Sequence, residues 1–103
     1  MRRLILGTNE PEPTPESPWE IGASYIIRTV TFHYTGRLVS ACNQWLVLED
    51  VAWIADSGRW AQAVESGNYK EVEPWPKGAR VIIGAGAIVD ASKIATPLPT
   101  SQK

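Results

Sequence analysis

The chain has 103 residues, of which 44% are hydrophobic and 20% charged, and its net charge is −1. This length predicts one domain built on a single core. The ten basic residues are scattered along the chain, which argues against nucleic acid as a partner. One cysteine excludes an intramolecular disulfide, and one cysteine with one histidine supplies too few ligands for a dedicated zinc site. We therefore expect no metal, no cofactor and a reducing compartment.

The first residues combine two arginines with a short apolar run, Leu4, Ile5 and Leu6. Three apolar residues are fewer than the seven or so that a signal-peptide core needs, so this segment is interpreted as mature sequence. We expect the run to pair as a short edge strand on a neighbouring sheet. No apolar run approaches the roughly 18 residues that span a bilayer, so no membrane partner is expected.

Residues 8–18, TNEPEPTPESP, contain four prolines and three glutamates. Proline fixes φ and removes an amide donor, which favours extended polyproline II geometry. Residues 1–20 are therefore predicted to form an extended N-terminal arm. Two interpretations stay open, a flexible tail and an arm held by a neighbouring molecule.

Three strands are predicted next, over residues 24–32, 35–41 and 45–55, as an antiparallel meander with turns near His33 and at 42–44. The first carries apolar residues on both faces, as expected for a strand that is central or lies at a subunit contact. The third is broken by Glu49 and Asp50, which predicts a bulge or bend between two strand halves.

Residues 45–60, WLVLEDVAWIADSGRW, hold three of the five tryptophans and are expected to form the core. Asp56 and Ser57 predict a helix N-cap, the helix spans 58–66, and Gly67 ends it. Trp60 begins an apolar stripe that would pack on the sheet, so Trp45 and Trp60 are interpreted as structural.

The remaining elements are an edge strand at 71–75, a strand at 79–84, and short strands at 87–89 and 94–96 separated by a turn at 90–93. The predicted fold class is mainly β (α+β). It is an antiparallel twisted sheet or small partly open barrel of about five or six strands, with one short packed helix and the N-terminal arm. Residues 21–97 would form the domain, and 98–103 a C-terminal tail.

No set of residues predicts catalysis. Gly84 and Gly86 precede a strand rather than a phosphate-binding helix. His33 and Cys42 lie at opposite ends of one predicted strand, roughly 30 Å apart. Glu49 and Asp50 would point to opposite faces of a regular strand. We therefore expect a non-enzymatic protein.

Arg28, Arg37, Arg59 and Arg80 lie in or beside predicted elements with aromatic residues nearby. Arginine beside an aromatic ring can grip phosphates and stacked bases, and it can also build interface hot spots. The candidate interaction residues are therefore Arg28, Arg37, Arg59, Trp53, Trp75 and the apolar run Leu4, Ile5 and Leu6. Trp53, just past the predicted bend, is the ring that we expect to serve function.

The order of YIIRT (25–29), TGRLVS (35–40), LVLEDVAW (46–53) and a short helix ending AVESG (63–67) resembles a family of small phage and prophage proteins of unknown function. The resemblance covers residues 24–67, and 79–96 more loosely. This chain has AWIA (52–55) where the family tends to carry an Arg-Arg-aromatic run, which weakens any basic ligand site there. The resemblance implies phage origin and a compact β-sheet with one helix, and it transfers no catalytic residue.

Two functions are compatible with this sequence. One is an oligomeric virion protein, such as a capsid-decorating subunit, whose partners are its own copies or a major phage structural protein. It would lie in the virion, and in the host cytoplasm during assembly. The other is an anti-defence binder that sequesters a host nucleotide signal, with Arg28, Arg37 or Arg59 on phosphates and Trp53 or Trp60 on a base.

Overall fold

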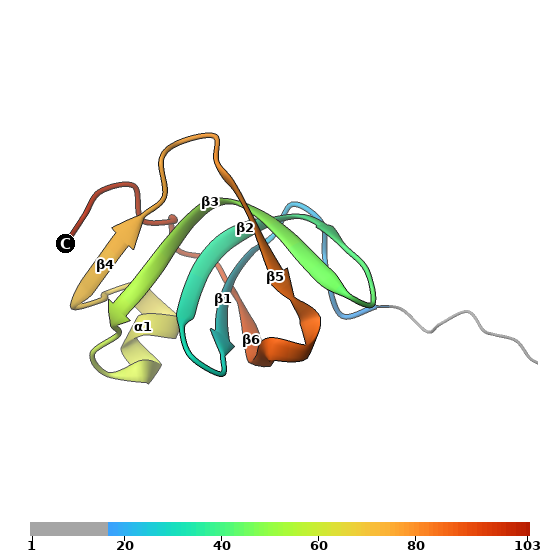
Figure 1. The fold of residues 1–103 in the computed structure, drawn as a ribbon. Coiled ribbons are helices and arrows are strands. Elements are labelled where there is room, and N and C mark those ends of the chain that lie inside the picture. Colours follow the sequence, from blue (N-terminus) through green and yellow to red (C-terminus); the bar gives the residue numbers. More distant parts are fainter. Residues whose placement is uncertain (1–16) are drawn as a thin grey trace, which may run out of the picture.

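The computed structural model describes residues 17–103. Its element order is β1 (Ser24–Thr29), β2 (His33–Ala41), β3 (Trp45–Asp56), α1 (Trp60–Ser66), β4 (Glu71–Pro74), β5 (Arg80–Gly84), the short 3₁₀ helix η2 (Ala85–Ala87) and β6 (Ile88–Ile94). All strand pairs are antiparallel, and the six strands form one open sheet (Figure 1). The predicted fold class, mainly β with one packed helix, is confirmed.

β1 lies inside the sheet, with β2 on one side and β6 on the other. The sheet continues from β2 to β3 and then to β4. This position explains why β1 carries apolar residues on both faces, since neither face is turned to water. The predicted central placement of this strand is confirmed.

β3 is bent at the predicted position. Asp50 has a φ of 53°, in the left-handed region that few non-glycine residues adopt, and the pairing of β3 with β2 shifts its register there. The first half of β3 pairs with β5 and the second half with β4. The bend therefore allows one strand to hold two different neighbours on the same edge.

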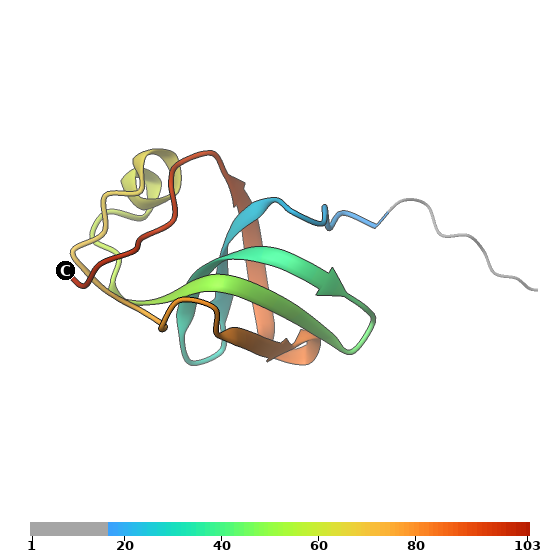
Figure 2. The ribbon, with the colours of Figure 1, turned by 90° about the horizontal axis from the view of Figure 1, so that it is seen from above.

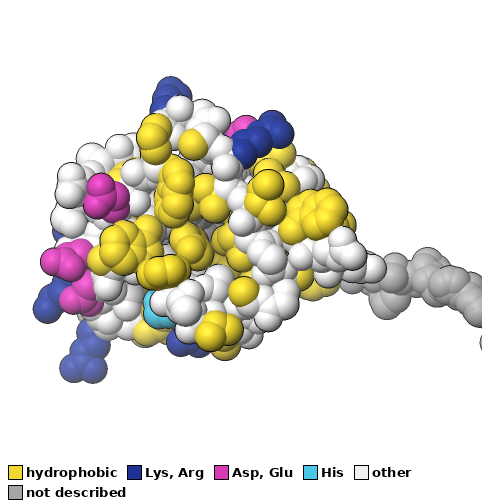
Figure 3. Space-filling model, viewed as in Figure 1, with side chains coloured by type: hydrophobic (Ala, Val, Ile, Leu, Met, Phe, Trp, Pro, Cys, Tyr) yellow, Lys and Arg dark blue, Asp and Glu magenta, His cyan; other side chains and the backbone are white. Residues whose placement is uncertain are grey.

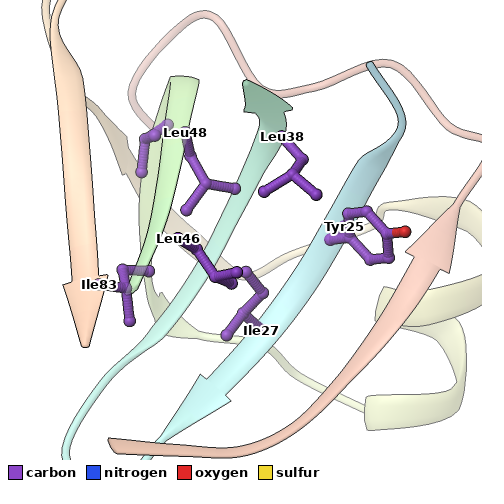
Figure 4. Packing of buried hydrophobic residues seen from close by; sticks show 7 residues of the cluster. Tyr25, Ile27, Leu38, Leu46, Leu48 and Ile83 are labelled. Carbon is purple, nitrogen blue, oxygen red and sulfur yellow. The ribbon is translucent and has the colours of Figure 1, made fainter. Parts of the chain in front are cut away.

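Two hydrophobic clusters fill the protein, where the sequence predicted one core. The first is built on Tyr25, Ile27, Leu38, Leu46, Leu48, Val51 and Ile83 (Figure 4). The second lies beneath α1 and is built on Ile26, Ala52, Ile54, Ala63, Tyr69, Val72 and Ile94. Because successive residues of a strand face opposite sides, β1 and β3 each contribute to both clusters. The single core was wrong because a one-layer sheet needs cover on both faces.

Trp45 is not a core residue, contrary to the prediction, because 44% of it is exposed at the first position of β3. Trp60 is half-buried and packs against the second cluster, as expected. The two tryptophans differ because Trp60 is the first residue of α1, which packs on the second cluster, whereas Trp45 lies at the end of a strand.

The helix begins two residues later than predicted. α1 starts at Trp60 with Arg59 as its N-cap residue, which makes no capping hydrogen bond through its side chain. Asp56 instead accepts a hydrogen bond from the N–H of Gly58, at 2.9 Å, within the turn that leaves β3. The predicted Asp56–Ser57 cap is therefore wrong, whereas Gly67 ends the helix in the left-handed conformation as predicted.

β6 is one continuous strand, where the sequence predicted two short strands around a turn at 90–93. Asp90 and Lys93 look like turn residues, but each finds an ion-pair partner, Arg28 and Glu20 respectively. Polar side chains are compatible with an edge strand whose outer face meets water. The connection that does turn is η2, between β5 and β6.

Both ends of the described chain contact the domain. Trp19, in the predicted arm, packs edge-on against Tyr25 with ring centroids 5.1 Å apart. At the other end, Lys103 exchanges two backbone hydrogen bonds with Val72 of β4. Figure 2 shows this C-terminal segment running on the same side of β3 as α1. The last residues thus cover the outer edge of β4.

Candidate functional site

Aromatic side chains from three separate segments line a groove on the sheet. Its volume is about 490 Å³, and we call it the aromatic groove. The lining residues are Phe32, Tyr34, Trp53, Glu73, Pro74, Trp75 and Pro76. The space-filling view shows hydrophobic side chains gathered over this part of the molecule, on the face seen in Figure 1 (Figure 3). This size lies within the range of roughly 300–1,000 Å³ that is typical of ligand pockets.

The four rings of the groove form a continuous row. Trp53 contacts Phe32 with centroids 6.0 Å apart and ring planes at 89°. Phe32 contacts Tyr34 at 6.3 Å, and Tyr34 contacts Trp75 at 5.9 Å with the planes tilted by 51°. The first two contacts are edge-to-face, a geometry in which two aromatic rings attract each other.

Strand pairing places the middle of the groove. Tyr34 of β2 lies opposite Trp53 of β3, and Trp53 lies opposite Glu73 of β4. Ala52 and Ile54, on either side of Trp53, are buried in the second cluster beneath α1. Because side chains alternate along a strand, Trp53 must point to the opposite face. The groove therefore lies on the side of the sheet away from the helix.

The tight β1–β2 turn fixes Phe32. The hydroxyl of Thr29 donates to the carbonyl of Phe32 at 2.7 Å and accepts from its N–H at 3.0 Å. The backbone N–H of Thr29 donates to the same carbonyl at 2.8 Å. A buried threonine therefore fixes the backbone that carries this exposed ring.

Trp75 is held at the far end of the row by its backbone. Its N–H donates to the carbonyl of Val51 at 2.7 Å, just beyond the last pair of β4. Pro74 and Pro76 flank it, and proline fixes φ on both sides. The Pro-Trp-Pro sequence therefore presents one ring on a stiff stretch of chain.

The rings of the groove remain substantially exposed. The exposed fraction is 48% for Phe32 and 37% for both Trp53 and Trp75. Large apolar side chains that cluster on a surface, rather than occurring singly, are typical of contact surfaces. Among residues 17–103, Glu73 is the one charged residue that lines the groove, so its floor is mainly hydrophobic.

Arg28 lies elsewhere, in a second arrangement of charge and aromatic rings. Its guanidinium binds the Asp90 carboxylate through two nitrogens, with the Nε–Oδ1 distance 2.8 Å, and it lies 4.6 Å from the ring centroid of Trp60. The ring of His33 contacts Trp60 edge-on at 5.5 Å. The hydrogen bond from Arg28 lowers the pKa of the Asp90 carboxyl below its ordinary value. This arginine is already paired with a carboxylate.

Arg37 and Arg80 belong to an ion-pair network at the bend of β3. Arg37 contacts both Glu49 and Asp50 at 3.0 Å, and Arg80 contacts Glu49 at 2.9 Å. Hydrogen bonds from Arg80 and then Arg37 lower the pKa of the Glu49 carboxyl. The two carboxylates reach one guanidinium because the bend breaks the regular strand, in which they would point apart.

The predicted arginines do not form one site. Arg37 lies opposite Ser24 at one end of β1, whereas Arg28 lies opposite His33 at the other end. Arg59 is exposed at the N-cap of α1. Among the described residues, only Arg28 has its guanidinium over an aromatic ring. A shared phosphate site with Trp53 is therefore not assembled by this fold.

Of the other predicted residues, Trp53 and Trp75 both line the groove. Leu4, Ile5 and Leu6 lie outside the described residues. Phe32 and Tyr34 were missed by the sequence analysis, although their i, i+2 spacing at the start of a strand is the signal of two rings on one face. His33 and Cys42 lie at opposite ends of β2, as expected, and Cys42 is exposed rather than packed.

Within residues 17–103, no group of three or more His, Cys, Asp or Glu side chains is placed to hold a metal ion. The helix found in this part of the chain is far too short to cross a bilayer. Comparison with family models, with curated proteins and with solved structures finds no match for the chain.

Proposed function

We propose that this chain is a non-enzymatic assembly protein that binds another protein through the aromatic groove. The observation that carries the proposal is a row of four rings, three exposed and Tyr34 half-buried, held by backbone hydrogen bonds and strand pairing. The rings belong to Phe32, Tyr34, Trp53 and Trp75. Tryptophan and tyrosine dominate the binding energy of many protein interfaces. A prearranged row of them loses little conformational freedom when a partner binds.

The chemistry of the groove favours a peptide or protein over a small charged ligand. Its rings offer apolar faces, and the tyrosine hydroxyl and two indole N–H groups are hydrogen-bond donors suited to backbone carbonyls. The one charged lining residue, Glu73, is acidic and would repel a phosphate. The resemblance described above would place the assembly in a phage particle, with its own copies or a major structural protein as the partner.

The alternative, a nucleotide binder, has weaker support. Its one favourable feature is the Arg28 guanidinium over the ring of Trp60. Asp90 occupies that guanidinium, and Glu49 and Asp50 occupy that of Arg37, so a phosphate would have to displace carboxylates. Calorimetry with cyclic nucleotides and ADP-ribose derivatives tests this alternative, since heat that disappears in Arg28→Ala would favour it.

The assembly role is tested by comparing Trp53→Ser with Ile82→Ser. Both replace a large exposed hydrophobic residue, but Ile82, which is 69% exposed on β5, lies outside the groove. Complexes of the tagged full chain are purified from the cells or particles that produce it, and each bound protein is quantified by mass spectrometry. We expect Trp53→Ser to lower one specific partner about tenfold or more, as for an interface hot spot, with Ile82→Ser unchanged. Equal partner amounts for the two variants would contradict the proposal.

A further inference from the structure

We infer that the occupant of the aromatic groove is the proline-rich segment 8–18 of a second copy of this chain. This inference rests on the proposed function, because it names the partner of the same groove. It begins from two features of one molecule that fit each other. One is a surface row of four aromatic rings, and the other is a segment with four prolines in eleven residues.

The groove has the form that a polyproline II helix requires. Such helices dock in grooves lined with aromatic rings. Adjacent rings of this row are about 6 Å apart and inclined to one another. The row is therefore long enough for at most about two turns of a polyproline II helix, whose turn rises about 9 Å.

The order of residues in the segment suits one docking face. A polyproline II helix has three residues per turn, so residues three apart share an edge. Pro15 and Pro18 would share one edge, and Pro11, Thr14 and Ser17 the next. The third edge would carry Pro13 with two of the three glutamates. Docking on the first two edges would therefore leave most of the negative charge in water and away from Glu73.

The place where the described chain begins favours a second copy over the molecule's own segment. Gly22 donates to the carbonyl of Leu38, and Ser24 pairs with Arg37, so the chain joins β1 at the end opposite the β1–β2 turn. Phe32 and Tyr34 lie at the turn, about 20 Å further along the six residues of β1. In Figures 1 and 2 the described chain starts on the opposite side of the molecule from β4. This separation favours a groove on a second copy over the molecule's own groove.

Each copy would then offer one segment and one groove. Two copies can exchange segments reciprocally, or many can join head to tail. Either arrangement is a known way to build an assembly, and both leave the sheet unchanged. The binding would depend on the prolines of one copy and the rings of the other.

The test uses the full chain and two variants, one in each half of the contact. Trp53→Ser removes a central ring, and the double variant Pro15→Ala, Pro18→Ala removes the proline pair of one edge. Analytical ultracentrifugation over a range of concentrations measures self-association. We expect the wild type to associate and each variant to associate at least about tenfold more weakly. An equimolar mixture should recover a one-to-one complex, because the groove of the proline variant and the segment of Trp53→Ser are both intact and form one contact.

Ile82→Ser, which lies outside both the groove and the segment, serves as the matched control and should associate like the wild type. A wild-type protein that is monomeric at every concentration would overturn the inference. A segment that binds the groove of its own molecule would also give a monomer, so the inference is overturned in that case by the same result. Association that persists in the proline variant would overturn it as well. Neither result affects the assembly role, which fails only when no partner in native complexes depends on Trp53. The two failures are therefore distinguishable.

Discussion

Gly36 of β2 lies against Leu48 and Val51 of the first cluster, and we predict that Gly36→Ala destabilises the protein. The added Cβ would lie 3.1 Å from Leu48 Cδ2, 3.2 Å from Leu48 Cβ and 3.2 Å from Val51 Cγ2. A rotamer change can move the leucine methyl, but the leucine Cβ is fixed to its backbone. The strands must therefore separate slightly, at the point where β3 bends.

The magnitude follows from two opposing effects. One extra methyl group in a well-packed site costs about 1–3 kcal/mol. Alanine also restricts the unfolded chain, which returns about 0.4–1 kcal/mol where the backbone conformation is tolerated. Gly36 is not among the residues with positive φ, so alanine brings no backbone strain. The net loss of stability should be about 1–2 kcal/mol, which lowers the Tm of a domain of this size by roughly 4–8 °C per kcal/mol.

Urea denaturation followed by circular dichroism measures this loss. Val51→Ala supplies the matched test, because it removes one of the three close contacts. The double variant should lose less stability than the sum of the two single variants, since the two sites are in contact. A Gly36→Ala protein that is as stable as the wild type would refute the reasoning. The stabilisation that alanine gives by restricting the unfolded chain would then be at least as large as the steric cost in the folded protein.

Three further changes have expected outcomes. Glu49→Gln should make the stability of the protein fall less steeply in acid, because Arg80 and Arg37 lower the pKa of Glu49 below its ordinary value of 4.5. The ionised Glu49 stabilises the fold above that pH, and this stabilisation is lost as the pH falls through the pKa of the folded state. Urea denaturation at several pH values from about pH 6 to 3 measures the difference between the variant and the wild type. Tyr69→Phe should be neutral or stabilising by up to about 1 kcal/mol in thermal melts, because the Tyr69 hydroxyl is buried without a partner among the described residues. Leu38→Ala, in the first cluster, should cost about 2–5 kcal/mol by urea denaturation, and a smaller loss would mean that the site collapses around the deletion.

The positions of β1 to β5 and the bend could be predicted from local pattern alone. The β-branched and aromatic residues of β1 predict a strand, and two adjacent carboxylates in an apolar run predict the break in β3. The helix stop at Gly67 is equally local, because glycine adopts a left-handed conformation without strain. Each of these features depends on residues that are neighbours in the chain.

The features that could not be predicted depend on partners distant in sequence. Asp90 looks like a turn residue until Arg28, 62 positions earlier, is known to lie beside it. The groove likewise needs the register that sets Tyr34 against Trp53, and this register is shifted by the bend. Trp45 was interpreted as a core residue, although 44% of it is exposed. Composition does not reveal which face of a sheet lacks cover.

β1 inserts Ile26 into one cluster and Tyr25 and Ile27 into the other. Removing this strand would expose both clusters together, so neither can persist without the other, and the domain should unfold in a single cooperative step. Its central amide protons should then exchange with solvent only through global unfolding, with the same free energy that denaturant reports. Because β1 also ends at Thr29, which anchors Phe32, no partly unfolded form lacking this strand can keep the aromatic groove intact.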